Sequence, residues 1–189
     1  MSVRAHPTPQ RAAALVVAVG VTCALHIGKL PPAVPALQAG LGISLVQAGF
    51  LLSLVQLAGM CLGVFVGLSA DRFGPRRVML VGLLGLAMGS AWGALAASPG
   101  MLLASRALEG LGFLLAVLPA PALIRRHVES PRLLSRALGW WGAYMPLGTA
   151  LALLVGAPVI ESMGWRVVWL GLSAVSLLAA LGLQASVPP

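Results

Sequence analysis

Six long apolar segments, separated by short polar stretches, dominate the pattern along the chain. They cover about residues 12–37, 45–70, 78–97, 101–124, 137–160 and 167–185. Each approaches or exceeds the roughly 20 apolar residues that a membrane-spanning helix needs. The pattern therefore predicts an all-α membrane protein with six transmembrane helices. The first segment follows Arg4 and Arg11 as a secretory signal would, but it runs on through three prolines and five more segments follow, which favours a retained helix.

The composition excludes a soluble or a disordered protein. Of the 189 residues, 59% are hydrophobic and 8% are charged, against about 25% charged residues in an average soluble domain. Too few charged side chains are present to cover a globule of this size, so the lipid bilayer must be the main solvent. Cys23 and Cys61 lie inside apolar segments without metal-ligand spacing, and no phosphate-binding loop is present. We therefore expect no metal and no cofactor.

The positive charges lie almost entirely on one side of the predicted membrane. Nine arginines outside the segments fall on the side of the N-terminus: Arg4, Arg11, Arg72, Arg76, Arg77, Arg125, Arg126, Arg132 and Arg136. Only Arg166 falls on the other side. Because cytoplasmic loops collect basic residues, both termini are predicted to be cytoplasmic. The net charge of +8 is thus explained by topology and not by nucleic-acid binding, and eleven arginines beside one lysine suggest a bacterial cytoplasmic (inner) membrane.

An internal repeat relates the two halves of the chain. At an offset of 90 residues, 71–76 falls on 161–166, and both read acid, two residues, Gly, one residue, Arg. At an offset of 86, the Pro-Ala-Leu of 35–37 falls on that of 121–123. We therefore predict a single six-helix domain over 1–189, built from three-helix repeats over about 12–97 and 101–187. With three helices each, the second repeat enters the membrane from the opposite side, an arrangement typical of secondary transporters.

A motif between the second and third segments carries a family resemblance. Its residues are Gly67, Asp71, Arg72, Gly74, Arg76 and Arg77. It resembles the signature between helices 2 and 3 of the major facilitator superfamily, departing from it at Pro75, where a basic residue is usual. Residues 106–112 resemble the fourth-helix motif of that family, with Glu109 where Gln is common. The resemblance covers the first six helices of a twelve-helix family, and the style of the sequence is similar to cyanate and nitrate permeases.

The resemblance implies secondary active transport of a small solute by alternating access. In that family, the carboxylate and glycine of the loop around Asp71 are taken to lock against the second half of the transporter and to release as it rocks. A purely topogenic basic loop is the alternative. Glu129, in the other basic loop, is expected to pair with an arginine of the 71–77 loop.

Three ionisable residues lie inside the predicted helices: Lys29, Arg106 and Glu109. Arg106 and Glu109 are three residues apart and can pair on one helix face, and His26 shares a face with Lys29. Helices 1 and 4 line the central cavity in the family fold, so the resemblance places all four around one aqueous site.

The charges of these four residues sum to +1 when His26 is neutral, which predicts an anionic substrate bound mainly by Lys29 and Arg106. Glu109 would then be their partner and a possible proton carrier. Three alternatives stay open: a structural clamp of Arg106 with Glu109, a Lys29 that reaches the outer interface, and a His26 that only makes a helix hydrogen bond.

Two other classes of protein are alternatives to a transporter. The segment 67–70 resembles a nucleophile turn of intramembrane serine proteases, but Asp71 and Arg72 follow Ser69 directly and no histidine lies in the fifth or sixth segment. An enzyme is therefore not expected. A channel or scaffold is the other rival. Because 189 residues match one half of a transporter, we expect a missing C-terminal half, a second copy, or a fragment without transport of its own.

Overall fold

The structure is a computed structural model that describes residues 8–187, all of them in helices or in the short turns between helices. The helices are α1 (Pro9–Gly28), α2 (Leu30–Leu41), α3 (Leu45–Phe73), α4 (Pro75–Ala94), α5 (Pro99–Val117), α6 (Ala120–His127), α7 (Pro131–Gly142), α8 (Tyr144–Met163) and α9 (Trp165–Ser186). Six continuous stretches are long and apolar enough to cross a membrane: α1–α2, α3, α4, α5–α6, α7–α8 and α9. The six predicted transmembrane segments are thus confirmed.

Three of the six stretches are broken near prolines. The first breaks at Lys29, before Pro31 and Pro32, and the fourth breaks at Leu118 and Pro119. The fifth breaks at Ala143, shortly before Pro146. A proline removes a backbone donor and clashes with the preceding turn, so helix axes bend at these places. The first break lies at Lys29, whose side chain is buried in the interior of the bundle.

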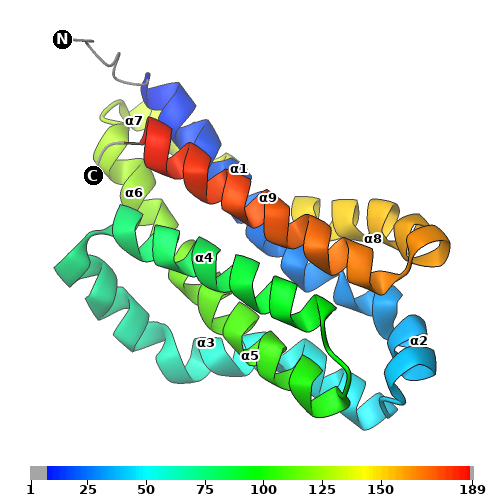
Figure 1. Cartoon of the computed structure of the whole chain (residues 1–189). Helices are drawn as coiled ribbons and strands as arrows, with labels where there is room; N and C mark the ends of the chain where they lie inside the picture. The colour runs from blue at the N-terminus through cyan, green and yellow to red at the C-terminus, as the bar shows by residue number, and fades with distance from the viewer. Residues whose placement is uncertain (1–7, 188–189) are drawn as a thin grey trace.

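The tightest helix crossing joins α4 to α5. A Cβ atom added to Gly82 would lie 2.4 Å from the backbone nitrogen of Ala116, and one added to Gly112 would lie 2.6 Å from that of Leu86. Only glycine permits the two backbones to approach so closely, as at many membrane helix contacts. α4 also packs along α9, and α1 packs along α8 (Figure 1). These pairs connect the two predicted repeats.

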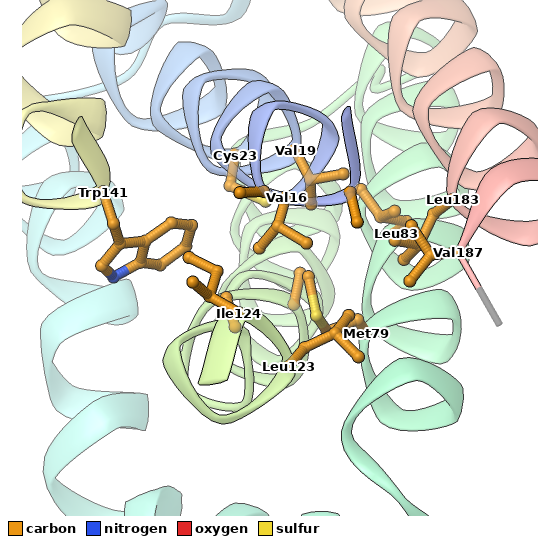
Figure 2. Packing of buried hydrophobic residues seen from close by; sticks show 14 of the residues in the cluster. Val16, Val19, Cys23, Met79, Leu83, Leu123, Ile124, Trp141, Leu183 and Val187 are labelled. Atoms are coloured by element: carbon orange, nitrogen blue, oxygen red, sulfur yellow. The ribbon is translucent and has the colours of Figure 1, made fainter. Parts of the chain in front are cut away.

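A hydrophobic core joins α1 to helices of both halves. Figure 2 shows Val16, Val19 and Cys23 of α1 among side chains from α4, α6, α7 and α9, with Trp141 directed toward them. A second core cluster includes Leu30, Leu37 and Trp169 at the other end of the bundle. The start of α1 and the end of α9 lie at one end of the molecule (Figure 1), as an even number of crossings requires.

The helices differ sharply in how much of their surface the domain covers. In the most apolar part of the α1–α2 stretch, 61% of the residues are buried, against 19% for α3 and 22% for α7–α8. α3 lies at the edge of the bundle beside α5 (Figure 1) and exposes Phe50, Met60 and Val64. These apolar faces are suited to lipid or to further transmembrane helices.

Candidate functional site

A cluster of charged side chains lies in the centre of the bundle. Lys29, at the break between α1 and α2, places its Nζ 2.6 Å from Oε1 of Glu109 in α5. The same ammonium donates to Oγ of Ser90 in α4, at 2.9 Å. It also lies 4.3 Å from the ring centroid of Trp169 in α9, a cation–π distance. Four of the six transmembrane stretches therefore meet at this one ammonium group.

Arg106 approaches the same carboxylate from one turn earlier in α5. Its guanidinium pairs with Oε2 of Glu109, as the spacing of three residues predicts. It also donates to the backbone oxygen of His26, at 2.8 Å. Each oxygen of the Glu109 carboxylate thus has its own cation. The guanidinium in addition ties α5 to the backbone of α1.

His26 completes the cluster on the side of α9. Its Nε2 lies 2.8 Å from Oγ of Ser176, within hydrogen-bonding distance. Its Nδ1 lies 3.8 Å from Oε1 of Glu109 and has no hydrogen-bond partner. The structure therefore brings together all four residues that the sequence singled out inside the membrane.

The cluster is closed on every side by this chain. Lys29 and His26 are 0% exposed, and Arg106 and Glu109 are 1% exposed. With His26 neutral, two cations face one carboxylate, which leaves a net charge of +1. A single charge at the centre of a transmembrane helix costs roughly 2.5–3.5 kcal/mol, so such groups persist when they are paired. Glu109 compensates one of the two positive charges, and the contacts of Lys29 with Ser90 and the ring of Trp169 help to stabilise the remaining one.

The polar partners of the cluster were not predicted from the sequence. Ser90, Trp169 and Ser176 come from α4 and α9, whereas the ionisable residues come from α1 and α5. Ser90 also donates to the backbone oxygen of Trp169, at 2.8 Å. A serine or a tryptophan in an apolar segment is common, so the sequence carries no local signal for these contacts.

The loop motif lies far from the cluster, at the turn between α3 and α4. Gly74 adopts φ +88° and ψ 140°, and Gly164, its counterpart at the offset of 90 residues, adopts φ +85° and ψ 158°. Arg76 donates to the backbone oxygen of Gln184 at 2.6 Å, while Asp71, Arg72 and Arg77 are exposed. Gly67 is exposed, and a Cβ atom added there would meet nothing within 4 Å. Arg76 is thus engaged with α9, whereas the other charged residues of the motif and Gly67 lie on the exposed surface of the described residues.

The expected pairing of Glu129 is not formed in this structure. Among the described residues, every ion pair within 4.0 Å involves Glu109, and Glu129 is exposed between α6 and α7. The physical reason is that exposed ion pairs gain little, typically under about 1 kcal/mol, and do not hold long side chains in place. An interaction of Glu129 with the 71–77 loop would require a different arrangement of the loops.

A second candidate region is a cavity between α1, α3, α5 and α8. It has a volume of about 330 Å³ and is bordered by Ile27, Val55, Gln56, Phe113 and Tyr144, among others. Its walls are mainly apolar, with the amide of Gln56 and the hydroxyl of Tyr144 as polar groups. The ring of Tyr144 stacks on Trp141 with centroids 4.4 Å apart. Sequence reasoning missed this cavity, because its polar groups are isolated residues in apolar segments.

Comparisons with known proteins give one consistent result. Residues 13–188 match the family model described as Major Facilitator Superfamily. The puromycin resistance protein of Streptomyces alboniger is 37% identical over 151 residues, which is 79% of this chain and 30% of that protein. The tetracenomycin C resistance and export protein of Streptomyces glaucescens is 32% identical, with 82% of this chain and 29% of that protein aligned. The matched region thus spans about 30% of the length of these relatives.

Solved structures agree with the sequence comparison. The inward-open conformation of the xylose transporter XylE from E. coli superimposes with a TM-score of 0.74 at 16% identity. The alignment covers 91% of this chain and 47% of that structure. A D-xylose–proton symporter gives the same TM-score at 17% identity. At this level of identity, the likeness concerns the fold.

Proposed function

The chain belongs to the major facilitator superfamily, and from that premise we propose that it forms half of a secondary transporter for a small organic solute. It works by alternating access in a bacterial cytoplasmic membrane, with both termini in the cytoplasm. The cavity between α1, α3, α5 and α8 carries the proposal. Its apolar walls with two isolated polar groups suit a solute with an apolar body and few hydrogen-bonding groups.

The relatives support this class of substrate. Their names refer to puromycin, tetracenomycin C and, for a protein of Bacillus subtilis that is 28% identical over 152 residues, methylenomycin A. All three are organic molecules. In the proposed transporter, Phe113 and Tyr144 contact the apolar part of such a solute, and Gln56 contacts its polar groups.

A small anion is the weaker candidate for the substrate. Lys29 and Arg106 already share the carboxylate of Glu109, and neither side chain is accessible from the surface of the six helices. An anion would have to open the bundle and displace a carboxylate held by both cations. The charge cluster is therefore assigned a role inside the domain, where it holds α1, α4, α5 and α9 together.

A second set of transmembrane helices completes the proposed transporter. The exposed apolar faces of α3 and α8 and the exposed groups around Asp71 and Gly67 support this part of the proposal. The missing helices come from a C-terminal half or from a second copy of the chain. The motif with Asp71 then forms the gate between the two sets of helices.

Transport by everted membrane vesicles tests the proposal. The full chain is expressed in a bacterial strain without its own drug efflux pumps, and vesicle uptake of radiolabelled puromycin is measured with and without a proton gradient. We expect gradient-dependent uptake, with a raised KM in Tyr144→Ala and an unchanged KM in the control Leu178→Ala, whose side chain lies on the exposed face of α9. Gradient-dependent uptake of nitrate or cyanate, with no uptake of puromycin, would contradict the proposal and identify a small anion as the substrate. Uptake that does not depend on the proton gradient would indicate a channel.

A further inference from the structure

We propose that a groove between the start of α1 and α7 binds one anionic phospholipid, with an acyl chain in the groove and its phosphate on Arg136. The groove has a volume of about 410 Å³. Val17 of α1 and Leu133, Ala137 and Trp140 of α7 contribute to its walls. Apart from Gln10 and Arg136, every residue that borders it is apolar. Such a lining matches a hydrocarbon chain and offers few partners to a polar solute.

The groove is separate from the cavity assigned to the transported solute. The two share no bordering residue: Gln10, Val17 and Ala137 border the groove, and Ile27, Gln56 and Tyr144 border the cavity. α7 and α8 meet at Ala143, so the groove borders the part of this stretch before the break and the cavity borders the part after it. A ligand in the groove therefore does not compete for the transport site.

The charge around the groove selects the headgroup. Arg136 borders the groove and is exposed, and Arg132 lies one turn earlier on the same face of α7, also exposed. Arg11, at the start of α1, adds a third exposed cation beside Gln10. Within the described residues, no carboxylate lies within 4.0 Å of these arginines, since the ion pairs found there all involve Glu109. An anionic phosphate is the ligand that complements them.

The position of the groove along the membrane normal fits the same ligand. The arginines lie on the side that the distribution of basic residues assigns to the cytoplasm, where the leaflet carries anionic lipids. Trp140 is 64% exposed at the edge of the groove, whereas its neighbour Trp141 is buried in the core. Tryptophan side chains concentrate at the level of the headgroups. Along α7, Arg132 and Arg136 come first from the cytoplasmic side and Trp140 follows one turn deeper, so the arginines lie at the level of the phosphate and the tryptophan lies at the border with the acyl chains.

Native mass spectrometry of the full chain in detergent tests this site. The delipidated protein is titrated with phosphatidylglycerol or phosphatidylcholine, and the retained lipid is counted. We expect tighter binding of phosphatidylglycerol, weakened about five-fold by Arg136→Gln, in line with the contribution of one basic residue near an anionic surface. Arg136→Lys retains most of the affinity. The control Arg77→Gln, which removes an equal charge from another exposed site on the same predicted side, changes the affinity less than about two-fold.

Additional measurements distinguish this lipid from other possible ligands of the groove. Ala14→Trp, at an exposed position that borders the groove, fills it and is expected to abolish retention of phosphatidylglycerol while the protein stays monodisperse. Inorganic phosphate is not expected to compete, because it cannot use the apolar walls. Equal affinity for the two lipids, or equal effects of Arg136→Gln and Arg77→Gln, would overturn the proposal. A dimer that Ala14→Trp dissociates, without lipid selectivity, would assign the groove to a second copy and would also overturn the proposal.

Discussion

Replacing Glu109 by glutamine separates a buried structural cluster from a hydrated binding site. The substitution keeps the shape of the side chain and its capacity for hydrogen bonds, and it removes the only negative charge of the cluster. Lys29 and Arg106 then remain in the interior with no counter-charge, at 0% and 1% exposure. Lys29→Met makes the opposite change, because it leaves the neutral pair of Arg106 and Glu109 in place.

The charges predict that Glu109→Gln destabilises the protein more than Lys29→Met does. With His26 neutral, the net charge of the cluster changes from +1 to +2 in Glu109→Gln and to 0 in Lys29→Met. Removing one partner of a buried pair costs about 3–5 kcal/mol, and here one substitution removes the partner of two cations. Lys29→Met loses hydrogen bonds to Ser90 and Glu109 but relieves the excess charge, so its cost is about 1–2 kcal/mol. The difference is about 1–4 kcal/mol, and each kcal/mol corresponds to roughly 2–4 °C in Tm for a chain of this size.

Thermal unfolding of the purified full chain measures this difference. Loss of the monodisperse peak after heating gives an apparent Tm for the wild type, Glu109→Gln and Lys29→Met. Glu161→Gln is the matched control, since it removes a carboxylate from an exposed position at the end of α8 and should change stability by less than about 0.5 kcal/mol. If Glu109→Gln were no more destabilising than Lys29→Met, or if both matched the control, the cluster would be hydrated and our assignment refuted.

Two further predictions concern glycines. Gly82→Ala places a Cβ atom 2.4 Å from the backbone nitrogen of Ala116 and should lower stability by about 1–3 kcal/mol. The control Gly171→Ala, which has open space around it, should not lower the Tm. Equal values of Tm for the two variants would contradict the close crossing of α4 and α5. Gly74→Ala and Gly164→Ala meet no atoms within 4 Å but hold positive φ angles, so each should cost about 1–3 kcal/mol through the backbone alone. Similar losses of Tm at the two positions are expected, and a loss at only one would separate the two turns.

The transmembrane architecture could be predicted from the sequence because one requirement dominates it: backbone groups in lipid must form their hydrogen bonds within the protein. A stretch of about 20 apolar residues can satisfy its backbone in lipid only as a helix or in a closed barrel. The second segment was predicted over 45–70 and is observed as Leu45–Phe73, and the first was predicted over 12–37 and runs from Pro9 to Leu41. The errors lie at the ends, where polar residues such as Gln10 continue the helix into the interface.

The candidate sites could be predicted only in part, because they depend on tertiary contacts. The pairing of Arg106 with Glu109 follows from a spacing of three residues, but Lys29 reaches Glu109 across 80 positions of sequence. The orientation of Lys29 depends on the helix break and on Trp169, which faces it from the last helix. Apolar segments have nearly uniform composition, so the face that each presents to its neighbours is not encoded in a readable pattern.

The repeat in the sequence corresponds to a reciprocal contact in the structure. Arg76 lies near the start of α4 and donates to the backbone oxygen of Gln184, near the end of α9. Its counterpart at the offset of 90, Arg166, lies near the start of α9 and donates to the backbone oxygen of Ala96, just after α4, at 3.1 Å. Basic side chains at the end of a helix complement its unpaired carbonyl groups and its dipole. The two antiparallel helices therefore cap each other by the same means at both ends.

Polar contacts also join α4 and α9 between these two ends. Ser90 donates to the backbone oxygen of Trp169, and Ser173 donates to that of Ala87, both at 2.8 Å. The charge cluster adjoins these contacts through Lys29, which binds Ser90 and faces Trp169. Hydrogen bonds inside a membrane bundle hold helices together where the hydrophobic effect does not. The buried polar residues thus form a rigid centre that joins both repeats, whereas α3 and α8 expose apolar faces at the surface of the bundle. In the proposed transporter, which rocks against a second set of helices, the rigid centre preserves the domain, and the exposed helices are the ones free to change partners.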